Sequence, residues 1–304
     1  MIIGAGLAGL LAAHAFPKEP IAEAAPESTE AHKALLRFRS DAVARLTGIE
    51  FKAVKVRKGI WSQGGFVAPN IALANSYSQK CLDGRIEGER SIWNLEPVTR
   101  WIAPENLYEQ LIDACGNRIN WGFEVNFKAR TEWNDTTINT APLPVVLKQL
   151  GIDSGLAFER APITVQRYRV KKCDAFQTIY FPDGHTPLYR ASITGDILIM
   201  EFAGGQPSDN AIYTAELFVS RAFSLPLDGM EEIGAVEQRY GKISDVDAAT
   251  RKALLGKLTQ EYGIYSVGRF ATWRNLLLDD VVDDLSVVKR LMKSSDYERR
   301  IAAS

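Results

Sequence analysis

The chain opens with three glycines at the spacing Gly-x-Gly-x-x-Gly, and the motif begins three residues after the first residue. This spacing is typical of the strand-to-helix turn in a dinucleotide-binding βαβ unit. Gly4 permits the tight turn, Gly6 lets a pyrophosphate approach bare backbone, and Gly9 allows the helix to pack closely on the strand. Glu23 lies 19 residues after Gly4, where an acid accepts a hydrogen bond from a ribose hydroxyl. The motif predicts a nucleotide site on an α/β fold.

The segments around the glycines favour the same interpretation. Ile2–Ile3 supply a short strand, and residues 21–23 form a second strand that ends in the acid. Between them, residues 7–16 are rich in alanine and leucine and predict a helix that Pro17 closes. The alternative is a purely structural turn, because glycines also gather in ordinary turns.

The start of this predicted helix is the expected phosphate contact. N–H groups at Gly6, Leu7 and Ala8 would point at the phosphates together with the positive end of the helix dipole. No basic residue directly follows Glu23, which disfavours a 2′-phosphate on the ribose. The sequence therefore favours FAD or NAD over NADP.

Length and composition set modest bounds. The 304 residues, 46% of them hydrophobic, suit a nucleotide domain plus a substrate domain, and a net charge of −1 excludes a strongly basic, nonspecific nucleic-acid binder. Cys81, Cys115 and Cys173 are too few and too scattered for a disulfide framework or a zinc site, so we expect no metal. No apolar run reaches membrane-spanning length, and the glycine motif stands where a signal peptide would be. We expect a cytoplasmic protein without a membrane segment.

The C-terminal segment is the second informative region. A strand-like stretch that starts at Tyr265 runs into a turn at Gly268, and a helix opens at Asp279. The apolar residues of this helix fall on one face: Val281, Leu285, Val288 and Met292. Acids crowd its first turns and bases its last, which matches the helix dipole, and its N-terminus would stabilise negative charge on a reduced flavin beside it.

Four segments resemble the FAD-binding fold of amine oxidases, protoporphyrinogen oxidase and UDP-galactopyranose mutase, and they occur in family order. They are the opening glycine motif and the segments 138–144, 180–192 and 268–279. The resemblance implies that the opening motif and Glu23 bind the ADP half of FAD. It also implies that Gly268, Arg269 and Asp279 lie near the ribityl chain and the isoalloxazine ring. Arg269 most resembles the arginine that contacts flavin or substrate in the mutases.

The chain departs from these families at two places. After the ribose-binding acid they usually continue Arg-x-Gly-Gly, which this chain lacks, so Arg37, Arg39 and Ser40 are the predicted replacements for the second phosphate contact. In the mutases a tyrosine that holds the substrate diphosphate follows the Gly-Arg pair. Asn275 stands at the matching place, which disfavours sugar-nucleotide ring contraction.

A narrower resemblance concerns the substrate. The segment from His32 to Ser40, with Gly48 and Ile49, and the segment Lys58–Trp61 resemble compact bacteriophage flavoproteins encoded near enzymes of thymine hypermodification. Those proteins act on an amine or amino-acid adduct on the thymine methyl carbon. This resemblance implies DNA modification, with a modified base in DNA as the amine-bearing substrate and the cytoplasm of a bacterial host as the location.

Few side chains are candidates for the chemistry itself. Trp273 follows the Gly-Arg turn, and Tyr189 and Arg190 lie in the segment that resembles the substrate domain. His32 could reach phosphate or flavin, and its alternative is a capping or surface role. Because no triad is visible, the reaction must rest mainly on the cofactor.

Basic residues alternate along one predicted strand, where Arg167, Arg169 and Lys171 share a face, and they cluster again within 52–58. Such a strip could follow the phosphates of a nucleic acid, and the alternative is a solvated sheet face.

The predicted fold class is α/β, with a Rossmann-type FAD-binding domain and an interleaved smaller mixed-sheet substrate domain. The FAD domain is assigned to 1–50, 120–150 and 260–304, and the substrate domain to 51–119 and 151–259. The leading function is an FAD-dependent, amine oxidase-like oxidoreductase that oxidises an amine carbon. The alternatives are a mutase-like sugar-nucleotide isomerase and a flavin-binding module without catalysis.

Overall fold

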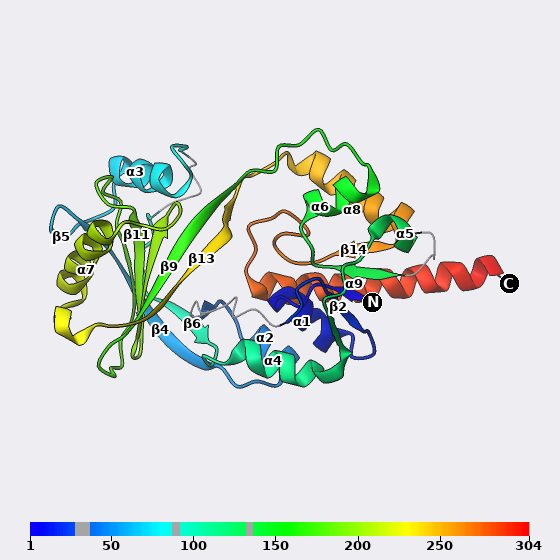
Figure 1. Ribbon diagram of the computed structural model, residues 1–304, viewed down its shortest axis with the longest axis horizontal. Helices are drawn as coiled ribbons and strands as arrows, with labels where there is room; N and C mark the ends of the chain where they lie inside the picture. The colour runs from blue at the N-terminus through cyan, green and yellow to red at the C-terminus, as the bar shows by residue number, and fades with distance from the viewer. Residues whose placement is uncertain (28–36, 87–91, 132–135, 304) are drawn as a thin grey trace.

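A computed structural model describes residues 1–27, 37–86, 92–131 and 136–303 of the chain. Two lobes lie side by side, each built on one β-sheet, and the end of the last helix projects beyond the right-hand lobe (Figure 1). The chain crosses between the lobes repeatedly, so the predicted interleaving of a Rossmann-type domain with a mixed-sheet domain is confirmed.

The first sheet is parallel and has the order β14-β8-β1-β2-β7. Its strands are β1 (Ile2–Ile3), β2 (Ile21–Glu23), β7 (Ile119–Trp121), β8 (Thr137–Asn139) and β14 (Ile264–Ser266). Ile2 pairs with both Ile21 and Ile138, and all three side chains are buried because helices cover both faces of the sheet. The predicted βαβ unit is therefore present, and the carboxyl ends of β1, β8 and β14 meet at one edge.

Two layers of helices cover this sheet. One layer contains α1 (Leu7–Ala15), α2 (Ala42–Thr47), α4 (Leu107–Cys115) and α9 (Leu278–Ala303); the other contains α5 (Phe127–Thr131), α6 (Leu143–Leu150) and α8 (Ala248–Tyr262). The predicted apolar face of the last helix is confirmed, since Val281, Leu285 and Val288 are buried against the first layer and Met292 packs on it. That helix begins at Leu278, one residue before the predicted start.

Helix α4 differs from the predicted division of the chain. Residues 51–119 were assigned to the substrate domain, yet Leu107, Leu111 and Cys115 pack in the same core cluster as α1. The amphipathic pattern of α4 shows that it must bury one face, but it does not show which partner covers that face.

The second sheet has nine strands in mixed order, so it is the larger of the two by strand number. Eight strands follow the path β13-β9-β12-β11-β10-β4-β6-β3, and β5 pairs with β4. Their bounds are β3 (Arg37–Phe38), β4 (Lys52–Ser62), β5 (Gly65–Phe66), β6 (Val98–Ile102), β9 (Arg160–Arg169), β10 (Phe176–Tyr180), β11 (Leu188–Thr194), β12 (Ile197–Ala203) and β13 (Glu231–Ile243). Two short 3-10 helices, Gly116–Arg118 and Leu227–Gly229, complete the described elements.

Two helices lie on opposite sides of the second sheet. Helix α7 (Asp209–Phe223) covers the outer face, where Ala191, Met200 and Phe202 pack against it. Helix α3 (Ile71–Cys81) covers part of the inner face, which turns toward the first lobe (Figure 1). Since side chains alternate along a strand, Arg190 and Glu201 lie on the inner face.

Candidate functional site

The turn between β1 and α1 leaves backbone exposed at Gly6. Gly6 is the N-cap of α1, it supplies no side-chain cap, and a Cβ atom placed on it would meet no protein atom within 4 Å. The first N–H groups of an uncapped helix are free to bind an anion. The side chain of Glu23 borders this turn, because its carboxylate accepts hydrogen bonds from the N–H groups of Ala5 (2.6 Å) and Ala25 (2.9 Å).

The two flanking glycines have packing roles. Gly4 has a φ of +95°, which strongly favours glycine, and a Cβ there would overlap the side chain of Thr140. A Cβ on Gly9 would overlap the backbone carbonyl of Gly4, so Gly9 allows α1 to pack closely on the end of β1. Thr140 fixes the neighbouring strand end by donating its hydroxyl to the carbonyl of Ile3 at 2.7 Å.

The C-terminal segment packs directly on this turn. Gly268 follows β14 with a φ of +92°, and a Cβ on it would lie 2.7 Å from the Cβ of Ala8. The N–H of Val267 donates to the carbonyl of Asn139, which continues the parallel pairing up to the turn. The predicted neighbourhood of the glycine motif and Gly268 is therefore formed at the carboxyl edge of the sheet, where open α/β sheets bind ligands.

We expect Gly268→Ala to lower the free energy of unfolding by about 2–4 kcal/mol, because it adds a left-handed alanine and a steric overlap. Urea titration of Gly268→Ala, Ala8→Gly and the double variant would separate the two causes. Removing the Cβ of Ala8 should relieve the overlap, leaving the double variant more stable than the sum of the single effects predicts. Strict additivity would show that the two residues do not touch.

Asp279 connects the start of α9 to residues 240 positions earlier. Its carboxylate accepts hydrogen bonds from the N–H of Arg39 (3.0 Å), the N–H of Ser40 (3.0 Å) and the hydroxyl of Ser40 (2.7 Å). The guanidinium of Arg39 forms an ion pair with Asp280. Three residues assigned to the cofactor site are thus in contact, but the acid of Asp279 is engaged by protein groups and is only 6% exposed.

Arg37 corrects a prediction. Its guanidinium donates to Thr178 Oγ1 (2.6 Å), to Thr194 Oγ1 (3.0 Å from Nε) and to the carbonyls of Gln177 and Ile193. All of these acceptors lie on β10 and β11 of the second sheet, so Arg37 does not extend to the turn at Gly6 as a phosphate ligand. The reason is that β3 pairs with β6 and joins the second sheet.

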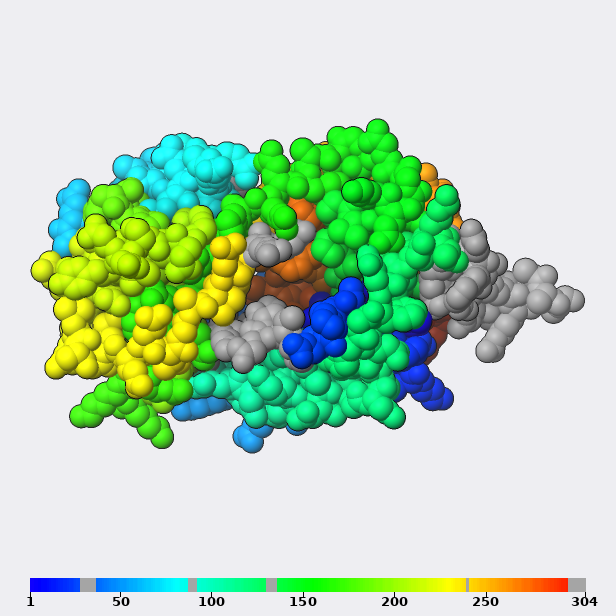
Figure 2. Space-filling view, viewed as in Figure 1, coloured from blue at the N-terminus to red at the C-terminus, as the bar shows by residue number. Residues whose placement is uncertain are grey.

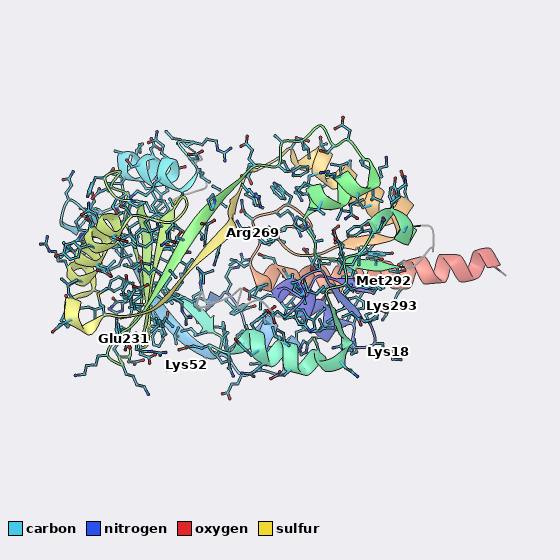
Figure 3. All side chains as sticks on the ribbon, viewed as in Figure 1. Lys18, Lys52, Glu231, Arg269, Met292 and Lys293 are labelled. Carbon is cyan, nitrogen blue, oxygen red and sulfur yellow. The ribbon has the colours of Figure 1, made fainter. Side chains whose placement is uncertain are left out.

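Arg269 lies between the lobes (Figure 3). Its Nη2 donates to the carbonyl of Gly241 on β13 (3.2 Å) and to Asn275 Oδ1 (3.3 Å). In the space-filling view the molecule is hollowed between the lobes, and C-terminal residues in orange and brown form the floor (Figure 2). The predicted position of Arg269 beside a ligand site is compatible with this placement, and its contact with a flavin or substrate stays a prediction.

Tyr189 and Arg190 belong to a charged network on the inner face of the second sheet. Arg190 binds both carboxylate oxygens of Glu201 through Nε and Nη2, and the hydroxyl of Tyr189 donates to Glu201 Oε1 at 3.0 Å. Lys242 lies 3.3 Å from the Tyr189 hydroxyl. Tyr189 is 0% exposed, so it orients Glu201 and does not face the hollow, whereas the side chain of Arg190 is 38% exposed.

The network makes the free energy of unfolding depend on pH in the acidic range. Burial alone would raise the pKa of Glu201, but the charge and hydrogen bonds of Arg190 outweigh burial and lower the pKa below its ordinary range. A carboxyl group whose pKa is lower in the folded than in the unfolded state stabilises the fold at any pH above its unfolded-state pKa. This stabilisation is lost as the pH falls through its folded-state pKa. We expect urea midpoints of the wild type to fall as the pH drops below about 4.3. The Glu201→Gln variant should lack that part of the slope, and parallel curves would contradict the assignment.

A further candidate, Trp273, is enclosed in the core and does not line the hollow. The indole of Trp273 is 3% exposed, packs edge-on to Phe158 at 5.0 Å and donates to the carbonyl of Ser244 at 3.1 Å. A side chain enclosed in this way cannot stack on a ligand, so the catalytic role predicted for Trp273 is corrected to a core role. His32 lies outside the described residues.

Two arginines of the predicted basic strip, Arg167 and Arg169, are paired with acids. Arg169 lies 2.9 Å from Asp196 and 3.6 Å from Glu105, and Arg167 lies 3.8 Å from Glu105.

Over the described ranges we find no group of three or more His, Cys, Asp and Glu that could hold a metal ion. None of the helices in those ranges combines the length and the hydropathy of a membrane-spanning segment.

Comparison with known structures agrees with this geometry. A reduced UDP-galactopyranose mutase has a TM-score of 0.61 at 15% identity, over 96% of this chain and 93% of its own. A tetrameric 2-methyl-3-hydroxypyridine-5-carboxylic acid oxygenase scores 0.53 at 9% identity, over 95% and 81% of the two chains. An L-proline dehydrogenase from P. horikoshii scores 0.53 at 11% identity, over 87% and 86%. No protein-family model and no curated protein sequence matches the chain. The chain has the fold of FAD-binding flavoproteins.

In this flavoprotein fold, sequence reasoning found the residues of the turn but missed three that organise the site. Thr140 follows β8, Glu201 lies within the apolar strand β12, and Lys242 is the second-last residue of β13. Only Glu201 carried a usable signal, because a lone acid in an otherwise apolar strand must be paired when it is buried.

Proposed function

We propose that the protein is an FAD-dependent enzyme whose β1–α1 turn holds the diphosphate of FAD. One observation carries this proposal: the open backbone at Gly6 lies beside the contact between Ala8 and Gly268. A Cβ on Gly6 would occupy open space of the kind a pyrophosphate needs, so the residues present fit the cofactor.

Each group of the turn has a defined part in holding the cofactor. The first N–H groups of α1, at Leu7 and Ala8, would donate to the diphosphate, because α1 has no side-chain cap. Glu23 would accept from the adenosine ribose, and its hydrogen bonds to Ala5 and Ala25 hold the carboxylate in place for that contact. Gly268 would bring the C-terminal segment to the flavin half.

The leading reaction is oxidation of a carbon next to an amine nitrogen. When bound, FAD supplies the two-electron acceptor: the amine carbon loses a hydride, the nitrogen loses a proton, and water hydrolyses the resulting imine with cleavage of the C–N bond. One structural neighbour is named an L-proline dehydrogenase, which supports a substrate of this kind. The chain itself would orient the amine and exclude water, and the hollow between the lobes is the place for it.

A sugar-nucleotide mutase is the second candidate. It is favoured by the TM-score of 0.61 with the UDP-galactopyranose mutase, which extends over nearly all of both chains. Asn275, where the mutases carry a tyrosine, argues against it.

Spectroscopy of the purified protein tests the proposal and separates the candidates. An FAD enzyme should show flavin absorbance that survives gel filtration and is released by denaturation. An amine oxidase should bleach with its amine without air and yield peroxide in air, whereas a mutase should act only after prior reduction of the flavin. A flavin-binding module should do neither. A folded, colourless protein that takes up no added FAD would refute the cofactor.

The finer proposal places the amine on a modified thymine in DNA, on the resemblance to phage flavoproteins. Binding to DNA should weaken steeply as salt rises, because phosphate contacts release counterions. A gel shift over a salt series would measure this. Absence of any shift at low salt would remove DNA as the substrate.

Arg269→Gln should slow flavin reduction by about tenfold or more, because it removes a charge placed between the lobes. Stopped-flow bleaching would measure the rate. Arg45→Gln, which changes an exposed arginine of α2, is the matched control. Equal reduction rates in the two variants would remove Arg269 from the active site.

A further inference from the structure

The inner face of the second sheet gathers positive charge around Arg37. The hydrogen bonds of its guanidinium go to hydroxyl and carbonyl oxygens of β10 and β11, so no carboxylate of the described residues pairs with it. Burial first, and then repulsion from Arg190 and Arg100, lower the pKa of Arg37 to about 10. Burial first, and then repulsion from Arg100, also lower the pKa of Lys58. Strand pairing places the four cations on one face. Lys58 is in register with Thr178, which accepts from Arg37, and Arg190 is in register with Tyr180. Arg100 is in register with Val54, four residues before Lys58 on β4.

The carboxylate of Glu201 faces this group and is already engaged. It binds Arg190 through two hydrogen bonds and also attracts Arg37 and Lys242. A lowered pKa means that the fold carries the charge of Arg37 at a cost relative to the unfolded chain. An anion that arrives beside Arg37 would offset this cost.

Arg190 is built to receive such an anion. Glu201 fixes two of its nitrogens, and Tyr189 in turn fixes Glu201. The remaining Nη1 makes no hydrogen bond with the described part of the chain, and the side chain is partly open to solvent. A guanidinium held along one edge and open along the other binds an oxyanion without losing further side-chain freedom.

We propose that this surface, formed by Arg37, Arg190, Arg100 and Lys58, binds a phosphate group of the substrate. The proposal rests on the proposed function, because the surface faces the lobe that would hold FAD. A phosphate fits better than a carboxylate because the cations Arg37, Arg190, Arg100, Lys58 and Lys242 outnumber the carboxylate of Glu201, and a phosphate brings more negative charge than a carboxylate does. The phosphate could belong to a free diphosphate or to the backbone of DNA.

The test uses flavin-loaded protein and two probes: sodium pyrophosphate, measured by isothermal titration, and a labelled single-stranded oligonucleotide, measured by anisotropy. The double variant Arg190→Gln/Glu201→Gln removes the oriented guanidinium together with its partner, so no unpaired carboxylate is left. We expect the double variant to bind at least one of the two probes about tenfold or more weakly, because charge-assisted hydrogen bonds are lost. Arg221→Gln, on α7 behind the sheet, is the control.

The outcomes are distinct. Weaker pyrophosphate binding in the double variant assigns a free diphosphate, and weaker oligonucleotide binding alone assigns the polymer. No binding of either probe by wild type, or equal binding by wild type and variant, overturns the proposal. If the double variant does not fold, Arg190→Lys takes its place in the test. The lysine keeps the ion pair with Glu201 but lacks the Nη1 edge, so it should weaken probe binding to the same extent. If the wild type stays colourless, the proposed function fails separately from this proposal. The titration is then made in a Gly6→Val background, because valine closes the empty dinucleotide turn to the probe.

Discussion

Gly6→Val is expected to leave the chain folded and to abolish binding of the FAD that we propose it holds. A Cβ at this position meets no protein atom within 4 Å, and the φ of −69° is one that valine adopts readily, so the free energy of unfolding of the apoprotein should change by less than about 1 kcal/mol. The side chain would instead occupy the space of the diphosphate. Losing two charge-assisted hydrogen bonds there corresponds to about a thousandfold weaker binding.

The measurement is the ratio of flavin to protein absorbance after gel filtration, together with circular dichroism and a urea titration. Reconstitution with excess FAD then gives the change in the dissociation constant. Wild-type flavin occupancy in a folded Gly6→Val protein would show that the diphosphate does not lie at this turn, and the cofactor site would have to be sought elsewhere.

Gly9→Ala is expected to have the opposite pattern, with loss of the fold itself. A Cβ on Gly9 would overlap the carbonyl oxygen of Gly4 and would come within 2.9 Å of its carbonyl carbon. Backbone atoms cannot rotate away as the end of a side chain can, so α1 must move off β1. We expect a loss of about 3 kcal/mol or more from the free energy of unfolding, a large part of what a domain of this kind has.

Gly256→Ala is the matched control for this experiment. Gly256 lies within α8, and a Cβ there meets nothing within 4 Å, so alanine should stabilise the helix by about 1 kcal/mol. Urea midpoints should therefore move in opposite directions for the same chemical change. Equal midpoints for Gly9→Ala and wild type would mean that α1 and β1 do not pack as described.

Comparison of Gly6 and Gly9 separates binding from folding within one motif. The two glycines lie three residues apart and look alike in the sequence. Gly6 is exposed at the N-cap of α1, whereas Gly9 is buried within its first turn. Measuring flavin content and stability on both variants would therefore assign each glycine its role.

The local parts of the fold were predictable because short-range spacing encodes them. The strand, turn and helix around Gly6 follow from three glycines and an apolar run, and the buried face of α9 follows from a repeat of three to four residues. The acid at Glu23 stands next to the turn for the same reason, since the βαβ unit fixes its distance along the chain.

Other expectations failed where the outcome depended on strand order. Arg37 was expected at a phosphate because it follows the ribose acid in sequence, but β3 pairs with β6 and carries it to residues more than 135 positions away. Trp273 follows a glycine turn, yet it has a φ of +46° and its ring enters the core. Neither outcome follows from the neighbouring residues alone.

The sequence by itself determined that the chain forms a dinucleotide-type βαβ unit at its start and an amphipathic helix at its end, because both depend on spacings within about 20 residues. Only the tertiary structure decided that Gly268 lies against Ala8, that Asp279 holds Arg39 and Ser40, and that Arg190 is fixed by Glu201. Most of these contacts join residues more than 200 positions apart, and even Arg190 and Glu201 meet only through the pairing of β11 with β12. Strand pairing and helix packing set which side chains meet, and these are properties of the whole chain rather than of any one segment.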